Sequence, residues 1–183
     1  TATFDGLGHV ITGLAINRSA TNYVGLFGYI DTGSVVRNVG LSGGSVVGNS
    51  RVGQLAGVVN GTVSGSHATG SVSGIDYIGG LAGKNFGTII NSYATGSVSG
   101  QSVIGGLAGL NQGGTVSGAY ATGNVTASDA NSQVGGLVGY LNGGTIANSY
   151  AAGSVSGQSS IGGLVGLNQG GTVSGAYATG NVT

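Results

Sequence analysis

Short apolar runs separated by glycine recur along the whole chain at intervals of 26 to 30 residues. The run IGGLAG at 78–83 returns at 104–109, 134–139 and 161–166, with a looser copy at 52–57 and a shorter one at 24–28. A second block, GTIINSYATG at 87–96, returns at 114–123, 144–153 and 171–180, and a third block such as SVS at 97–99 follows it. Every run is too short for an amphipathic helix. Three β-prone runs per repeat therefore predict an all-β protein, a parallel β-solenoid of six to seven three-strand coils of about 26 residues each.

Aligning the repeats places residues of one kind in columns that run along the stack. Three columns from the second block are predicted to point inward: Ile11, Val36, Val63, Ile89, Val116, Ile146 and Val173; Leu14, Val39, Ser66, Ser92, Ala119, Ser149 and Ala176; and Ile16, Leu41, Ala68, Ala94, Ala121, Ala151 and Ala178. The first block adds an inward leucine column: Leu26, Leu55, Leu81, Leu107, Leu137 and Leu164. Burial of each leucine is worth about 1.5–3 kcal/mol.

One column stands between two inward columns, so strand alternation predicts that its side chains point outward. Its members are Ala15, Gly40, His67, Tyr93, Tyr120, Tyr150 and Tyr177. Coils spaced about 4.8 Å apart would bring these tyrosine rings within stacking distance. The ladder either stiffens the rod or forms a binding surface, and Tyr93, Tyr120, Tyr150 and Tyr177 are the candidate site residues.

Composition narrows the class of protein. The 183 residues include 43 Gly and no Pro, Cys, Met or Trp, which excludes collagen, and 39% are hydrophobic, which excludes a flexible linker. Four basic and four acidic residues cancel, so neither nucleic acid nor an anionic membrane surface is an expected partner, and no apolar run could span a membrane. The repeat stops part-way at Thr183, and we expect residues 1–183 to be a single solenoid domain cut from a longer repeat protein.

Residues able to support catalysis are few and scattered. The acids are Asp5, Asp31, Asp76 and Asp129, and no two share a local motif that would suit acid/base chemistry. His9 and His67 have no partner at metal-ligand spacing, and the glycine strings lack the Lys-Ser/Thr ending of a phosphate loop, so tight turns explain them better. We therefore predict no enzyme activity, no cofactor and no metal site. Asn-x-Ser/Thr sequons begin at Asn17, Asn60, Asn124 and Asn181.

The blocks GGLAGLN at 105–111 and GGTIANSY at 143–150, with the openings FDGLGHVI at 4–11 and VGLFG at 24–28, resemble the GLUG-repeat regions of large secreted bacterial adhesins. Those proteins are similar to filamentous haemagglutinins, and the repeat also occurs in surface-anchored IgA-type metallopeptidases outside their catalytic domains. The resemblance implies a right-handed β-helical stalk at the bacterial cell surface. It transfers no catalytic or binding residue.

These observations favour a structural stalk of an extracellular adhesin, with a host or bacterial surface glycan or protein as its partner and end-to-end self-association between coil edges. One alternative is the non-catalytic repeat region of a surface-anchored peptidase. Another is direct binding of carbohydrate through the tyrosines, or of ice through outward hydroxyls such as Thr95, Ser97 and Ser99 around inward Val98.

Overall fold

The computed structural model describes residues 2–183, and over that range the chain winds through five parallel sheets, each built from one short strand per coil. Sheet A contains β1 (Thr3–Asp5), β5 (Val35–Arg37), β10 (Thr62–Ser64), β15 (Thr88–Ile90), β20 (Thr115–Ser117), β25 (Thr145–Ala147) and β30 (Thr172–Ser174). Sheet B contains β2 (Val10–Thr12), β6 (Gly40–Ser42), β11 (His67–Ala68), β16 (Tyr93–Ala94), β21 (Tyr120–Ala121), β26 (Tyr150–Ala151) and β31 (Tyr177–Ala178).

The other three sheets complete each coil. Sheet C contains β3 (Ala15–Asn17), β7 (Ser45–Val47), β12 (Ser71–Ser73), β17 (Val98–Gly100), β22 (Val125–Ala127) and β27 (Val155–Ser156). Sheet D contains β8 (Ser50–Gly53), β13 (Asp76–Gly79), β18 (Val103–Gly105), β23 (Gln133–Gly135) and β28 (Ser160–Gly162). Sheet E contains β4 (Phe27–Ile30), β9 (Ala56–Val59), β14 (Ala82–Asn85), β19 (Ala108–Gln112), β24 (Val138–Asn142) and β29 (Val165–Gln169).

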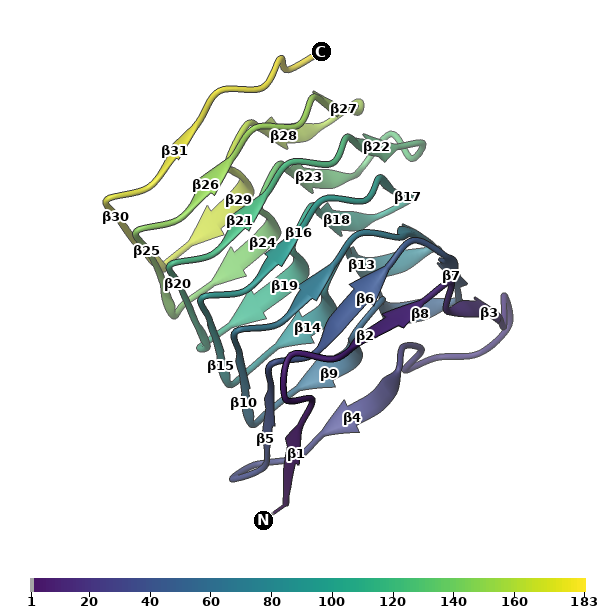
Figure 1. Cartoon of the computed structure of the whole chain (residues 1–183). Helices are drawn as coiled ribbons and strands as arrows, with labels where there is room; N and C mark the ends of the chain where they lie inside the picture. The colour runs from purple at the N-terminus through teal and green to yellow at the C-terminus, as the bar shows by residue number, and fades with distance from the viewer. Residues whose placement is uncertain (1) are drawn as a thin grey trace.

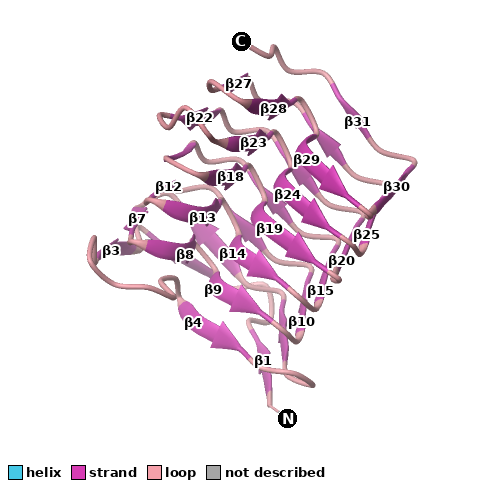
Figure 2. Ribbon diagram, turned by 180° about the vertical axis from the view of Figure 1, so that it is seen from behind, coloured by secondary structure: helices cyan, strands magenta, loops and turns pink. Residues whose placement is uncertain are grey.

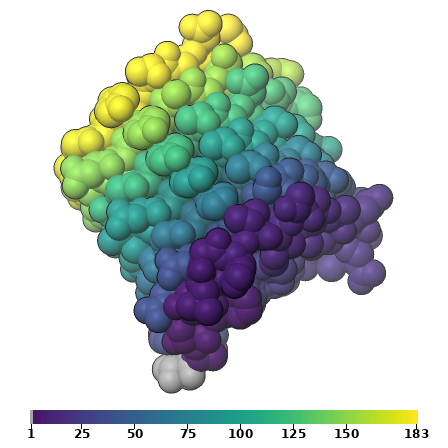
Figure 3. All heavy atoms as spheres, viewed as in Figure 1, coloured from purple at the N-terminus to yellow at the C-terminus, as the bar shows by residue number. Residues whose placement is uncertain are grey.

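The predicted parallel β-solenoid is confirmed, with about six turns spaced about 27 residues apart. Each coil lies on the one before it, from β1 near the N-terminus to β31 near the C-terminus (Figure 1), and sheets D and E are seen from behind in Figure 2. In the space-filling view the coils form adjacent bands of colour along the rod (Figure 3). No helix that could span a membrane occurs between residues 2 and 183.

Each of the five coils from β5 to β29 has five strands where the sequence predicted three, because two of the three blocks turn a corner within themselves. The first coil has four strands, since at the sheet D position only Val24 pairs, with Val52. The first block divides between β13 and β14 at Gly80–Leu81, and the second divides between β15 and β16 at Asn91, whose φ is 48°. A single residue in the left-handed region redirects the chain, and asparagine adopts that conformation more readily than most residues. The corners are therefore too short to appear as loops in the sequence pattern.

The first coil has a different register from the one that the column alignment predicted. Phe4, rather than Ile11, pairs with Val36, and Ile11 pairs with Leu41. Likewise Val10, rather than Ala15, lies opposite Gly40 in the outward column. Residues 6–9 separate β1 from β2, whereas only residues 38–39 separate β5 from β6, so the first coil is longer at this corner. An alignment by residue type alone cannot detect that insertion.

The predicted inward columns form the core in the middle coils. Leu55, Leu81, Leu107 and Leu137 are fully buried. One core cluster lies within sheets A, B and E, and a second cluster, mostly valine and isoleucine, lies between sheets C and D. In the end coils, Val10, Ile11 and Val173 are exposed because no further coil covers them.

Serines in one inward column bond to the backbone of two coils at once. The Ser92 hydroxyl donates to the Ile90 carbonyl at 2.9 Å and accepts from the Ser66 amide of the preceding coil at 3.1 Å. Ser66 and Ser149 repeat this arrangement. A buried hydroxyl with both hydrogen bonds made carries little desolvation penalty, which explains why the core accepts a polar column.

The glycine that closes each first block is required by backbone contact, and the prediction that it forms a tight turn is wrong. Gly57, Gly83 and Gly109 lie in or beside sheet E strands and none has a positive φ. A Cβ on Gly83 would lie 2.5 Å from the Arg51 carbonyl carbon, and one on Gly109 would lie 2.6 Å from the Ile78 amide nitrogen. Sheet E therefore presses against the sheet D backbone of the coil before, and only glycine fits between them.

Candidate functional site

The tyrosine column forms a continuous stack on the outside of sheet B. Ring centroids are 4.6 Å apart for Tyr93 and Tyr120, 5.0 Å for Tyr120 and Tyr150, and 5.3 Å for Tyr150 and Tyr177, with interplanar angles of 5° to 8°. His67 extends the stack at 4.9 Å from Tyr93. Each ring precedes a buried alanine such as Ala94 or Ala121, so alternation along β16 and β21 holds the rings outside.

Stacking determines which part of each ring reaches solvent. The two faces of Tyr93, Tyr120 and Tyr150 are covered by their neighbours, so the ladder offers ring edges and phenol hydroxyls. Burial, and then the neighbouring phenols, raises the pKa of Tyr120 above its usual value. A sugar stacks on an aromatic face, and within this ladder an uncovered face remains only at the ends, on His67 and Tyr177. Whether the four tyrosines bind a ligand stays a prediction.

A cavity of about 440 Å³ adjoins the His67 end of the ladder. It is lined by Leu7, Gly8, Asn38, Val39, Gly40, Gly65 and His67. A Cβ on Gly40 would lie 2.8 Å from the His67 Cε1 atom, so the imidazole already rests on the Gly40 backbone. The uncovered face of the imidazole is thus largely closed by the chain itself.

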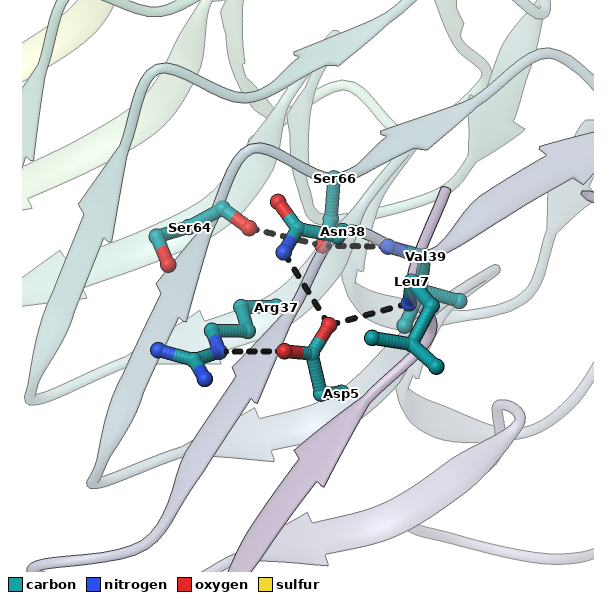
Figure 4. Close-up of polar contacts among 7 residues, drawn as sticks. All are labelled: Asp5, Leu7, Arg37, Asn38, Val39, Ser64 and Ser66. Carbon is teal, nitrogen blue, oxygen red and sulfur yellow. Dashed lines mark hydrogen bonds and ion pairs between the residues drawn. The ribbon is translucent and has the colours of Figure 1, made fainter. Parts of the chain in front are cut away.

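Beside this cavity, Asp5 ties the first coil to the second (Figure 4). Its carboxylate accepts hydrogen bonds from the Leu7 amide at 2.9 Å, the Arg37 Nε at 2.8 Å and the Asn38 Nδ2 at 3.0 Å. The Leu7 bond, followed by the Asn38 bond, lowers the pKa of Asp5. Arg37 and Asp5 form the one ion pair found among residues 2–183. Because its oxygens already accept three hydrogen bonds, the Asp5 carboxylate stabilises the turn and is poorly suited to proton transfer.

The other acids lie apart in the fold. Asp31 and Asp129 are exposed and accept hydrogen bonds from nearby backbone amides in their own turns. His9 is exposed at the first corner. Within the described range, 2–183, no group of three His, Cys, Asp or Glu residues could hold a metal ion.

Outward hydroxyls also form a column on sheet C. As the sequence predicted, Val98 is buried and Ser97 and Ser99 are exposed, while Thr95, also predicted to point outward, is partly buried. The strand pairing aligns Ser73, Ser99, Thr126 and Ser156, and the Ser156 hydroxyl donates to the Thr126 hydroxyl at 3.3 Å.

A second group of side chains, which the repeat pattern did not indicate, lies at the corner between sheets D and E. We call Tyr23, Arg51, Asp76, Tyr77 and Lys84 the corner cluster. The Arg51 guanidinium lies 4.8 Å from the Tyr23 ring centroid, and the Lys84 Nζ lies 3.5 Å from that of Tyr77. Both are within cation–π range.

The backbone at this corner is strained in three successive coils. Tyr23, Arg51 and Tyr77 have φ values of 60°, 56° and 55°. Each such conformation costs about 1–3 kcal/mol for a bulky residue, and strain of this kind concentrates at functional sites. In later coils the residue before the inward isoleucine or valine is Val103, Gln133 or Ser160, and none of them has a positive φ. This departure from the repeat is the sequence signal that could have identified the cluster.

Partial burial perturbs the charges of the corner cluster. It raises the pKa of Asp76 and, together with the Asp76 charge, that of Tyr77. Burial, and then the nearby Arg51, lowers the pKa of Lys84. The cluster therefore holds two cations that repel each other and one carboxylate that forms no ion pair with either.

Comparison with known proteins links the repeat to one family. Four segments, 76–99, 100–126, 130–156 and 157–183, match the family described as the GLUG motif. The chain is also similar to halomucin of Haloquadratum walsbyi (strain DSM 16790 / HBSQ001), with 49% identity over 63 residues. That match covers 34% of this chain and 1% of halomucin. No solved structure matches the chain.

Proposed function

The chain belongs to the GLUG-motif family, and we propose on that basis that it is a structural stalk segment of a large extracellular surface protein, an adhesin in which it holds other domains away from the cell. The similarity to halomucin supports a place within a much longer protein, since the matched part is 1% of that chain. The resemblance to adhesin repeat regions supports a cell-surface location and a part in cell or biofilm adhesion.

One observation carries the stalk proposal: the stack of coils is continuous both inside and outside. In every sheet, each strand hydrogen-bonds to the matching strand of the next coil. The leucine column runs along the inside of the stack and the tyrosine rings stack along its outside. At about 4.8 Å per coil, six turns add roughly 29 Å of length. Each coil contacts its neighbours only, so length is gained by adding repeats.

The tyrosine ladder fits this stiffening role better than a binding role. A ring whose faces are covered by its neighbours has stacking energy of about 0.5–1.5 kcal/mol per pair and has no face left for a sugar. Tyr93, Tyr120 and Tyr150 meet that condition, and Tyr177 is covered on one face by Tyr150. We therefore assign all four tyrosines to the rigidity of the rod.

The test replaces all four tyrosines with serine. With four ring stacks lost, counting that of His67 on Tyr93, we expect the free energy of unfolding to fall by about 2–6 kcal/mol. On a glycan array, we expect the serine variant to bind every glycan that the unchanged chain binds. The matched control changes the outward hydroxyls Ser73, Ser99, Thr126 and Ser156 to alanine, which removes no ring stack. A glycan signal that disappears with the tyrosines would refute the structural assignment of the ladder.

A further inference from the structure

The residues that break the repeat gather on one surface of the first three coils. Tyr77 and Lys84 belong to the first matched GLUG segment, yet Lys84 pairs with Leu110 of the next coil, and Leu110 pairs with Tyr140. A residue that differs from its neighbours in the column is not stabilised by stacking on a side chain of the same kind. The stacking of coils therefore does not explain why Tyr77, Lys84, Tyr23 and Arg51 occur at these positions.

The surface continues from the corner cluster across sheet E into a groove. Tyr29, on β4, lies with its ring centroid 6.5 Å from that of Tyr23, and its hydroxyl accepts a hydrogen bond from Asn60 Nδ2 at 2.5 Å. The groove has a volume of about 410 Å³ and is lined by Tyr29, Thr32, Asn60 and Phe86. Tyr23, Tyr29 and Phe86 are 46%, 50% and 42% exposed. Tyr23 and Tyr29 lie in the first coil described, where no earlier coil covers them, whereas Phe86 follows β14 within the rod and is exposed on its outside. Large aromatic side chains gathered on one surface indicate a contact surface.

The two cations at the corner are held by aromatic rings, and the nearby Asp76 carboxylate attracts both without forming an ion pair with either. Among residues 2–183, neither Arg51 nor Lys84 has a carboxylate within ion-pair distance. Their aromatic neighbours hold them in place, at 4.8 Å for Arg51 and 3.5 Å for Lys84. Their mutual repulsion would be relieved by an oxyanion, and guanidinium and ammonium groups are the donors that carboxylate and sulfate oxygens accept best.

We propose that this surface binds an acidic oligosaccharide. Arg51 and Lys84 hold its carboxylate or sulfate group, and its sugar rings lie against Tyr29 and Phe86 with their hydroxyls near Thr32 and Asn60. Asn60 belongs to the groove lining, where its Nδ2 donates to the Tyr29 hydroxyl.

Charge favours a sugar over an acidic peptide or a nucleic acid. The chain has a net charge of zero and four cations in all, so it cannot neutralise a run of anions. The surface offers two cations at one end and aromatic rings, a hydroxyl and an amide along the rest. A ligand with one anionic group and several hydroxyls matches that distribution. This proposal is independent of the stalk assignment, because the tyrosine ladder lies on sheet B and contributes nothing to it.

The experiment is calorimetric titration of the whole chain with four probes: a uronic-acid oligosaccharide, a sulfated oligosaccharide, a neutral oligosaccharide of the same length, and a short polyglutamate. We expect binding of the first, the second or both, which identifies the anionic group. Arg51→Gln and Lys84→Gln should each weaken that binding at least about tenfold. The control Arg18→Gln removes the same charge at an exposed position beyond β3 and should change affinity by less than about twofold.

A second variant tests the sign of the electrostatic effect. Asp76→Asn removes the negative charge nearest the cations and should tighten binding about two- to threefold. Thermal melts of all variants separate lost binding from lost folding.

Several results would overturn the proposal. They are the absence of binding to both acidic oligosaccharides, equal binding of the neutral oligosaccharide or of polyglutamate, an equal loss in Arg18→Gln, or weaker binding by Asp76→Asn. The tyrosine-to-serine variant of the ladder should bind the acidic probe like the unchanged chain, so failure of this proposal and failure of the stalk assignment give different results.

Discussion

At the scale of single residues, contact with the neighbouring coil decides which side chain a position can carry. Gly109 illustrates this because its Cα faces backbone atoms of the coil before, and backbone cannot move aside as a flexible side chain can. The same position in the first coil, Gly28, has no such coil before it, and a Cβ there would meet only the Tyr23 carbonyl oxygen at 3.1 Å. Glycine therefore recurs at this position because neighbouring coils approach closely there, and not because the chain forms a turn.

A pair of glycine variants tests this reading. Gly109→Ala should lower the free energy of unfolding by about 2–3 kcal/mol, because its Cβ would lie 2.6 Å from the Ile78 amide nitrogen. Gly28→Ala, at the same place in the motif, should cost less than about 1 kcal/mol. Chemical denaturation of both variants measures the difference. Equal losses would mean that backbone flexibility, not close approach, requires glycine here.

Asp76 provides a second residue-scale prediction, in its dependence on pH. Burial raises its folded-state pKa above the ordinary value of 3.8, so the folded chain holds this proton more tightly than the unfolded chain does. The resulting stability is fully present below the unfolded pKa and is lost as pH rises through the folded pKa. Asp76→Asn should therefore raise the melting temperature by about 1–2 °C near pH 7, and the gain should shrink near pH 3. A variant that melts lower than the parent near pH 7 would show that the carboxylate is stabilising.

At the scale of elements, the tyrosine ladder couples strands of sheet B that are each only two residues long. β16, β21 and β26 pair over two residues each, so they form few backbone hydrogen bonds, and the stacked rings add a second contact at each step. The energy should depend on how many neighbours a ring has.

Two tyrosines differ in that number. Tyr120 stacks on two rings, at 4.6 and 5.0 Å, whereas Tyr177 stacks on one, at 5.3 Å. Tyr120→Ser should lower the free energy of unfolding by about 1–3 kcal/mol and Tyr177→Ser by about 0.5–1.5 kcal/mol, since each pair contributes about that smaller amount. Equilibrium unfolding of the two variants decides the matter, and an equal or larger loss at Tyr177 would contradict a stacking contribution.

At the scale of the whole molecule, the core is a set of columns rather than a globule. A destabilising substitution in a middle coil should therefore weaken its packing against both neighbouring coils. Leu107 is fully buried between Leu81 and Leu137 in the core cluster of sheets A, B and E. Asp129 lies in the exposed turn between β22 and β23, where the repeat is longest.

Leu107→Asp should therefore destabilise the rod by more than about 4 kcal/mol, because it buries a charge without a partner. Asp129→Asn should change the free energy of unfolding by less than about 0.5 kcal/mol. Melting curves followed by circular dichroism compare the two, and similar melting temperatures would overturn the division between core and surface.

The sequence alone determined the solenoid, the inward leucine column and the outward tyrosine column, because these follow from the period of the repeat and from strand alternation. Family membership likewise follows from motifs that can be read along the chain. The role of each tyrosine does not follow from that pattern, since stacking and ligand binding require the same residues in the same column.

Tertiary structure alone decided the five-strand coil, the register of the first coil and the corner cluster. Asn91 divides the second block with a single left-handed residue, and the turn at residues 6–9 shifts Phe4 into the place predicted for Ile11. Arg51 and Lys84 lie 33 residues apart and meet only because sheet E folds back onto sheet D of the coil before, where Gly83 contacts Arg51. A repeat pattern reports what successive coils share, so it cannot report contacts made by the residues in which they differ.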